Sequence, residues 1–359
     1  MKWEKVAIKD ICTGIYDGPH ATPPLSDTGA IFLGISNFNN GRLDFSDIRY
    51  ISEDDLPKWT KRVIPQKNDI VFSYEATLNL YAIIPEGFRG CLGRRMALLR
   101  VDETKADYKF LYYYFYSDAW RATVNENIVL GATVDRIPLI KFPDFPVELP
   151  PLETQHRIAD ILSAYDDLIE NNQKQIKLLE EAAQRLYKEW FVDLRFPGHE
   201  NMEIVDGVPE GWKKERLVDI AEIQYGYAFD GTLFNADKNG TPIIRIRNIP
   251  QAETMDYTTE HVSENYLVQN GEIIVGMDGE FHINAWAGNT AYLVQRVCCI
   301  RPKNTEIKGW LLQAIYEPIK FFERTVVGAT VAHLGKKHLD SIYLLTSPEE
   351  FYEPFKTFF

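Results

Sequence analysis

Basic and amide side chains gather in three short stretches of the sequence, and their chemistry suits the surface of a nucleic acid. Arginine can donate two hydrogen bonds to guanine and asparagine can pair similarly with adenine, whereas lysine mainly neutralises phosphate. The alternation in IIRIRNI, residues 243–249, predicts that Arg245 and Arg247 share one face of a strand. As an alternative, each charge belongs to an ordinary ion pair on the surface. The candidate contacts in these stretches are Arg94, Arg95, Arg245, Arg247, Asn248, His333, Lys336 and Lys337.

The tetrapeptide Gly-Ala-Thr-Val occurs twice, at residues 131–134 and 328–331. Glycine lets a backbone approach closely, and a threonine hydroxyl with free amides can hold a phosphate or a base edge. The alternative is a bulged strand entry that only connects two parts of the fold. Two tyrosines near predicted loops could stack on a base that has left the duplex, unless they belong to the core. These considerations add the candidates Gly131, Thr133, Arg136, Thr330, Tyr74 and Tyr227.

The sequence lacks the spacings that catalytic and metal sites require. Residues 328–337, GATVAHLGKK, contain glycine and lysine without the spacing of a phosphate-binding loop. The 7 histidines show no metal-ligand spacing, and the 4 cysteines match neither a disulfide framework nor a zinc site. We therefore predict no catalytic residue and no bound metal.

The length and the net charge of the chain limit its possible functions. A chain of 359 residues predicts two domains, each with its own core. The formal net charge of −13 argues against nucleic acid unless basic side chains cluster locally, and it favours the competing function, a non-catalytic two-domain scaffold for protein interactions. No segment has the length and apolarity of a signal peptide or a membrane span, so we expect a cytoplasmic protein without membrane contact.

The two Gly-Ala-Thr-Val segments belong to a longer internal repeat. An offset of 197 positions aligns residues 129–162 with 326–359 without a gap, and similar segments precede them in the same order. Short apolar runs separated by turn residues predict strands, and one helix is expected late in each copy, at 108–121 and 308–322. The fold class is therefore α+β, with two mainly β domains whose different loops suggest two related but different ligands.

Between the copies, a heptad pattern predicts one helix of about 40 residues that ends near Phe191. Nine of the ten core positions are apolar, and Asn172 is the polar one, of the kind that fixes register and partner number. Such a stripe needs a partner helix, although an ordinary buried helix is the alternative. The positions are Ile158, Tyr165, Asn172, Leu179 and Leu186 at a, and Leu162, Ile169, Ile176, Ala183 and Trp190 at d.

Together these features resemble the specificity subunit of type I restriction-modification enzymes. The resemblance covers nearly the whole chain and depends on the combination of motifs, not on any single one. The motifs are GATVDRI from Gly131, PPLETQHRIADIL from Pro150, LYKEWF from Leu186, VPEGWKKERLVDI from Val208 and GATVAHL from Gly328.

The resemblance implies two target recognition domains, at 1–150 and 196–347, that each read one half of a bipartite double-stranded DNA site. A spacer helix at 151–195 would separate them and dock two methyltransferase subunits, and restriction subunits would join the complex. Residues 348–359 would begin a second spacer helix, most of which we expect to be missing, which leaves self-association through the first helix as a further expectation. The resemblance implies no cofactor on this subunit, with S-adenosylmethionine, ATP and magnesium on its partners.

Overall fold

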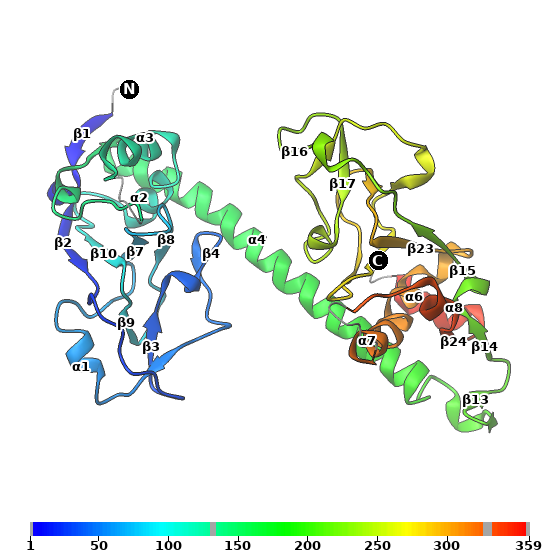
Figure 1. Ribbon diagram of the computed structural model, residues 1–359. Helices are drawn as coiled ribbons and strands as arrows, with labels where there is room; N and C mark the ends of the chain where they lie inside the picture. The colour runs from blue at the N-terminus through cyan, green and yellow to red at the C-terminus, as the bar shows by residue number, and fades with distance from the viewer. Residues whose placement is uncertain (1–2, 130–133, 326–331, 357–359) are drawn as a thin grey trace. The chain divides into compact units, whose positions relative to one another are not determined.

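The computed structural model describes residues 3–129, 134–325 and 332–356 (Figure 1). The chain divides into two compact units, Met1–Asn172 and Gln173–Phe359. The first of these is called unit 1 below and the second unit 2. The division falls inside the long helix α4, Leu152–Tyr187, so each unit includes one end of that helix.

Unit 1 is built on an antiparallel sheet of four strands in the order β2-β10-β7-β8. A second sheet, in the order β6-β3-β9, contains the parallel pair β3 and β9, and β1 pairs with β11 at the exit from the unit. The strands are β1 Glu4–Ala7, β2 Cys12–Asp17, β3 Ala30–Leu33, β6 Tyr50–Ile51, β7 Ile70–Ser73, β8 Tyr81–Ile83, β9 Gly90–Leu92, β10 Met96–Val101 and β11 Pro146–Leu149, with the short hairpin β4 Phe38–Asn39 and β5 Arg42–Leu43.

Unit 2 repeats this topology. Its four-stranded sheet has the order β15-β23-β20-β21, the parallel pair is β17 and β22, and β14 pairs with β24. The strands are β14 Lys213–Arg216, β15 Ala221–Tyr225, β16 Phe234–Asn235, β17 Thr241–Ile244, β18 Tyr257–Thr258, β19 Leu267–Val268, β20 Ile273–Gly276, β21 Ile283–Ala285, β22 Ala291–Leu293, β23 Val297–Pro302 and β24 Tyr343–Thr346. A small hairpin, β12 Ile204–Val205 and β13 Val208–Pro209, precedes them. The predicted duplication and the α+β class are confirmed.

Each helix predicted late in a copy is in fact a pair of helices. In unit 1, α2, Tyr108–Tyr114, is followed by α3, Asp118–Asn127, because the Ser117 hydroxyl accepts from the Trp120 amide and starts a new helix. In unit 2, α6, Lys308–Ala314, is followed by α7, Tyr316–Thr325, whose first turn contains Pro318. The short helices are α1 Leu56–Trp59, α5 Leu217–Ile220, α8 Lys336–Asp340 and α9 Glu353–Lys356.

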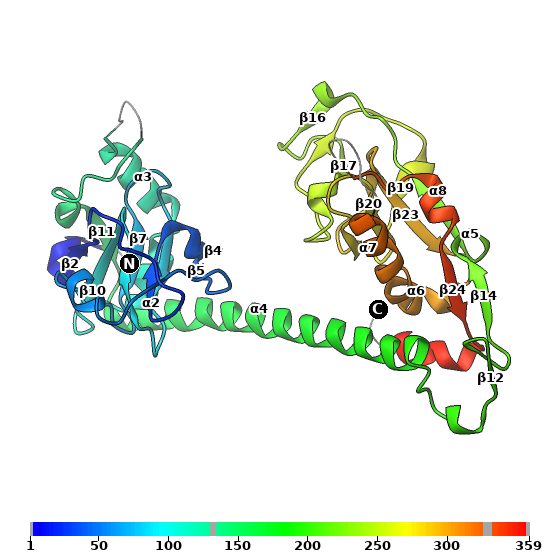
Figure 2. The same cartoon turned by 60° about the horizontal axis from the view of Figure 1, so that its bottom comes forward.

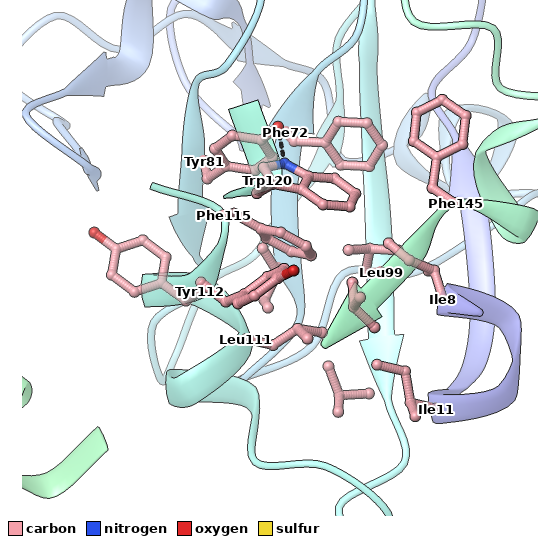
Figure 3. Close-up of a cluster of buried hydrophobic side chains, with 14 of the residues drawn as sticks. Ile8, Ile11, Phe72, Tyr81, Leu99, Leu111, Tyr112, Phe115, Trp120 and Phe145 are labelled. Carbon is pink, nitrogen blue, oxygen red and sulfur yellow. Dashed lines mark hydrogen bonds between the residues drawn. The ribbon is translucent and has the colours of Figure 1, made fainter. Parts of the chain in front are cut away.

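Aromatic side chains fill the space between the helices and the central sheet of unit 1 (Figure 3). Trp120 is fully buried and donates from Nε1 to the Tyr81 hydroxyl at 2.7 Å, which satisfies both polar groups inside the core. Phe115 stacks on Tyr81 with ring centroids 5.0 Å apart. In unit 2, α6 and α7 cover the central sheet in the same way (Figure 2).

The predicted heptad helix is confirmed as α4, which has 36 residues and continues as a π-helical turn, Lys188–Val192. Its first turns pack on unit 1 through Ala159, and the Gln155 side chain accepts from the Asp107 amide at 3.0 Å. Its last turns pack on unit 2 through Ala183 and through Phe191, whose ring lies 5.0 Å from Trp212. In the parts of the chain that the structure describes, no helix combines the length and apolarity needed to cross a membrane.

Candidate nucleic-acid interface

In unit 1, the segment that follows the first Gly-Ala-Thr-Val motif is hydrogen-bonded to the end of β7. Ile137 donates its amide to the Tyr74 carbonyl at 2.8 Å, and Ala76 donates to the Asp135 carbonyl at 3.1 Å. Tyr74 in turn donates to the carbonyl of Arg95, in the turn between β9 and β10, at 3.1 Å. The end of β7, the β9–β10 turn and the segment after the motif are therefore bonded side by side.

Unit 2 repeats these three backbone bonds at equivalent positions. Leu334 donates to Met277 at 2.7 Å, Gly279 donates to Ala332 at 3.0 Å, and Met277 donates to Arg296 at 2.9 Å. Both copies of the motif are thus followed by a strand-like segment held at the same edge of the fold. The motif residues Gly131, Thr133 and Thr330 themselves lie outside the described residues.

An arginine held by a carboxylate lies in this edge of each unit. Arg95 donates from Nε to Glu75 at 3.1 Å, and Arg296 donates to Asp278. Both arginines have a positive φ, 71° and 72°. This backbone conformation is uncommon for a residue with a side chain, and outliers of this kind gather at functional sites. Its occurrence at the same turn of both units shows that the two turns share one backbone geometry.

The second residue after each motif forms a β-bridge with the same acidic residue, Arg136 with Glu75 and His333 with Asp278. In unit 1, Arg136 forms a β-bridge with Glu75 and a second bridge with Val129, which closes the connection that contains the first motif. In unit 2, Nδ1 of His333 contacts the Asp278 carboxylate. Arg136 and His333 are both exposed, so each unit has an exposed basic residue bridged to the acidic residue that holds its arginine.

The prediction that Arg245 and Arg247 alternate along a strand is wrong. Strand β17 ends at Ile244, and residues Ile246–Asn248 form a 3₁₀ helix, because the Asn248 carboxamide oxygen accepts from the Arg245 amide at 2.8 Å and turns the chain. Asn37 makes the same bond to the Gly34 amide in unit 1, at 2.9 Å.

The Asn248 amide group is occupied inside unit 2, as is the Arg247 guanidinium. Both donate to Asp256. Burial pushes the pKa of Asp256 up, but these hydrogen bonds outweigh burial and leave the pKa below its usual value. An asparagine that shapes a turn in both units is better explained by the turn than by contact with adenine. Arg245 is different, because its guanidinium lies over the Phe234 ring with Cζ 5.5 Å from the centroid.

The two tyrosine candidates differ in exposure. Tyr74 is 5% exposed and belongs to the core of unit 1, where burial raises the pKa of its hydroxyl. Tyr227 is half-buried in an aromatic cluster, with ring centroids 5.0 Å from Phe229 and 5.2 Å from Tyr266. Arg94, Lys336 and Lys337 are exposed. DNA contact by each of these residues stays a prediction.

The apolar stripe of α4 is buried at its ends and exposed along its middle. Ile158, Leu186 and Trp190 pack against the cores of the two units and Ala183 is buried, whereas Asn172 is exposed. The remaining stripe residues are exposed by 37–63% of their surface, and they are Leu162, Tyr165, Ile169, Ile176 and Leu179. An exposed apolar row of this length is typical of a helix that packs against a partner.

The sequence reasoning missed Glu75, Asp278 and Arg296. A comparison of the two repeats, position by position, could have identified them. Arg95 and Arg296 are 201 positions apart, whereas Glu75 and Asp278 are 203 apart, so one fixed offset does not align all of them. The described residues, those of this edge included, contain no group of three or more histidine, cysteine or acidic side chains that could hold a metal ion.

Comparisons with known proteins agree with the repeated architecture. The family model for the type I restriction modification DNA specificity domain matches residues 1–181 and 209–349. The chain is 24% identical over 327 residues to the MjaIX specificity subunit of a type I restriction enzyme from Methanocaldococcus jannaschii, covering 86% of this chain and 73% of that protein. It is 30% identical over 150 residues to the EcoBI specificity subunit from Escherichia coli, covering 42% of this chain and 32% of that protein. The crystal structure of a type I restriction-modification S subunit from M. genitalium has a similar fold, with a TM-score of 0.56 at 17% identity, covering 99% of this chain and 88% of that one.

Proposed function

Because the chain belongs to the type I restriction modification DNA specificity domain family, we propose that it is the DNA-specificity subunit of a type I restriction-modification system. Each unit reads one half of a bipartite target in double-stranded DNA. The observation that carries the proposal is the edge that the two units share, where Arg95 pairs with Glu75 and Arg296 with Asp278, and where Arg136 and His333 form β-bridges with the same acidic residues. Two copies of one edge suit two contacts with one duplex.

The local charge distribution supports DNA despite the net charge of −13. Several arginines are neutralised by their own carboxylates and contribute little to an electrostatic surface, as Arg89 is by Glu53. Arg94, Lys336 and Lys337 are exposed, so they increase the positive potential close to the proposed contacts. The negative charge still favours the competing function, a scaffold that binds proteins only.

The exposed stripe of α4 supports a role in assembly. We propose that Leu162, Tyr165, Ile169, Ile176 and Leu179 pack against helices of methyltransferase subunits, and that restriction subunits join through that complex. Pairing with a second copy of this chain is the other expectation for the stripe. The catalytic groups, S-adenosylmethionine, ATP and magnesium then belong to the partner subunits, and the assembly works on DNA in the cytoplasm.

A domain exchange tests the proposal. Residues 1–150 are replaced by the corresponding part of a homologous specificity subunit, the chimera is expressed with its methyltransferase subunits in a host without other methylation, and the methylated motif is sequenced. We expect one half of a bipartite motif to change while the other half and the spacing are retained. An unchanged motif would contradict the assignment of unit 1 to a half-site.

Selection from a pool of random DNA, with the methyltransferase subunits present, separates the two candidate functions. A DNA-specificity subunit enriches one bipartite motif, and its binding weakens steeply as salt is raised. A protein-interaction scaffold gives neither an enriched motif nor salt-sensitive retention of DNA.

A further inference from the structure

Three arginines line one hollow on the surface of unit 1. The hollow has a volume of about 290 Å³ and lies between the start of the 3₁₀ helix Ile35–Asn37 and the β9–β10 turn. The residues that line it include Arg49, Arg94 and Arg95, and none of its described lining residues is Asp or Glu. Three guanidinium groups therefore meet at one place in a chain that is acidic as a whole, and that of Arg95 is also paired with Glu75, which does not line the hollow.

Packing within unit 1 fixes two of these arginines in position. The Arg49 guanidinium lies over the Phe32 ring, with Cζ 5.1 Å from the centroid, and its Nη2 occupies the space that a Cβ on Gly34 would take. Arg95 is fixed by its backbone turn and by Glu75. A guanidinium held over a ring is preorganised, so less side-chain entropy is lost when it binds a ligand.

Glycine at position 93 keeps the turn close to the neighbouring strand. The Gly93 amide donates to the Leu33 carbonyl at 2.6 Å, and a Cβ on Gly93 would lie 2.4 Å from that carbonyl oxygen. The turn that carries Arg94 and Arg95 is therefore bonded directly beside the start of the 3₁₀ helix. Local backbone contacts alone thus bring the two sides of the hollow together.

Unit 2 has an arginine at each of two backbone positions that correspond to the two sides of this hollow, and one of them stands where unit 1 has no arginine. Val294 donates to the Ile244 carbonyl at 3.1 Å, which is the counterpart of the bond from Gly93 to Leu33. Arg245 follows Ile244 directly and stands where unit 1 has Gly34, and Arg296 stands where unit 1 has Arg95. Both units thus have an arginine whose guanidinium lies over an aromatic ring and a positive-φ arginine two residues after the amide that bonds the neighbouring strand.

From this arrangement we infer that Arg49, Arg94 and Arg95 in unit 1, and Arg245 and Arg296 in unit 2, each form a site for one backbone phosphate of the DNA. The inference rests on the proposed function. A group that is common to two domains reading different half-sites is expected to contact what both half-sites share, which is the sugar–phosphate backbone. A phosphodiester also supplies a full negative charge and only acceptor oxygens, matching guanidinium groups that only donate.

The test measures binding of the complex with its methyltransferase subunits to a duplex that contains its own methylated motif and to one that lacks it. The variants are Arg49→Ala, Arg94→Gln and Arg245→Ala, each at several salt concentrations. A phosphate contact predicts that each variant binds both duplexes about tenfold more weakly, with the slope of log K against log salt lowered by about 0.9. Arg89→Ala is the matched control, because it removes an arginine that Glu53 already neutralises at the other end of β9.

Two results would overturn the inference. One is a set of variants with the same affinity and salt slope as the Arg89→Ala control. The other is weaker binding to the motif-containing duplex alone, which would make the arginines base contacts. Thermal unfolding of each variant shows whether the variant is still folded. The variant Arg49→Lys keeps the charge, so its slope of log K against log salt should equal that of the wild type. If the wild-type complex neither prefers the motif-containing duplex nor binds DNA in a salt-dependent way, the result contradicts the proposed function and not only the phosphate sites.

Discussion

Replacing Asp69 by alanine tests how a buried carboxylate holds an arginine inside unit 1. Asp69 is 2% exposed and accepts from Nε and Nη2 of Arg100 at 2.8 and 2.7 Å, and from the Gln66 amide at 2.7 Å. Arg100 also donates to the Ile64 carbonyl at 3.0 Å. Removing the carboxylate leaves a largely buried guanidinium without its anion and a backbone amide without its acceptor.

Unit 2 contains the same network with a more exposed carboxylate. The two units can therefore be compared within one molecule. Arg301 donates to the Glu272 carboxylate and to the Leu267 carbonyl, and Glu272 accepts from the Gln269 amide. The Glu272 side chain is 20% exposed, compared with 2% for Asp69. Water can therefore replace part of what Glu272 provides, and its loss should cost less.

The expected magnitudes follow from that difference in burial. Breaking a buried ion pair from one side costs about 3–5 kcal/mol, and the partial exposure of Arg100 places Asp69→Ala near the lower end, at about 3 kcal/mol. Glu272→Ala should cost about 1.5 kcal/mol, the size of one charged hydrogen bond at a partly hydrated site. These values correspond to roughly 150-fold and 12-fold changes in an opening equilibrium.

Amide hydrogen exchange measures both effects in one molecule, because the slowest amides of β7 and β20 report the opening of unit 1 and unit 2 separately. Asp69→Ala should accelerate exchange in β7 and leave β20 unchanged, and Glu272→Ala should do the reverse more weakly. The double variant Asp69→Ala/Arg100→Met should recover part of the loss, because it also removes the unpaired charge. Equal effects of the two single variants, or an effect of Asp69→Ala under about fivefold, would refute burial as the cause.

Three further outcomes are expected. Burial raises the pKa of Cys91 and Cys299 to about 12, so both thiols stay protonated at pH 8 and should react with Ellman's reagent at least roughly a hundredfold more slowly in native than in denatured protein. Tyr81→Phe removes the acceptor of the Trp120 indole and should lower the unfolding free energy of unit 1 by about 1–2 kcal/mol, measured by the same exchange experiment. Gly93→Ala forces a Cβ against a backbone carbonyl and should destabilise unit 1 by about 2 kcal/mol, read as a lower thermal midpoint.

The elements with long-range periodicity were predictable from the sequence. The heptad pattern identified α4 because one apolar stripe is repeated over many turns, and the 197-residue offset identified the duplication because a repeated fold preserves its apolar positions. The helix pairs α2–α3 and α6–α7 were missed as pairs because a single capping side chain or proline breaks a helix without changing the apolar pattern on either side.

The 3₁₀ turn after β17 was also missed, and its cause is a side-chain bond. Alternating residues in IIRIRNI fit a strand, but the Asn248 side chain bonds the Arg245 amide, and Asp256, eight residues along the chain, holds that asparagine. A short polar side chain competes with the sheet only when such a partner fixes it. The sequence pattern therefore predicted the wrong local geometry for Arg245 and Arg247, and their contact with DNA stays a prediction.

By itself the sequence determined the duplication, the class of fold, the long helix and the family resemblance, because these depend on periodicity and composition along the chain. Only the tertiary structure decided which partners surround each basic side chain. Arg100 and Arg301 lie inside carboxylate networks, whereas Arg49, which no sequence pattern singled out, joins Arg94 and Arg95 in one hollow. The physical reason is that a guanidinium's role depends on the carboxylates and rings brought near it by strand pairing, and those partners lie tens of residues away in the sequence.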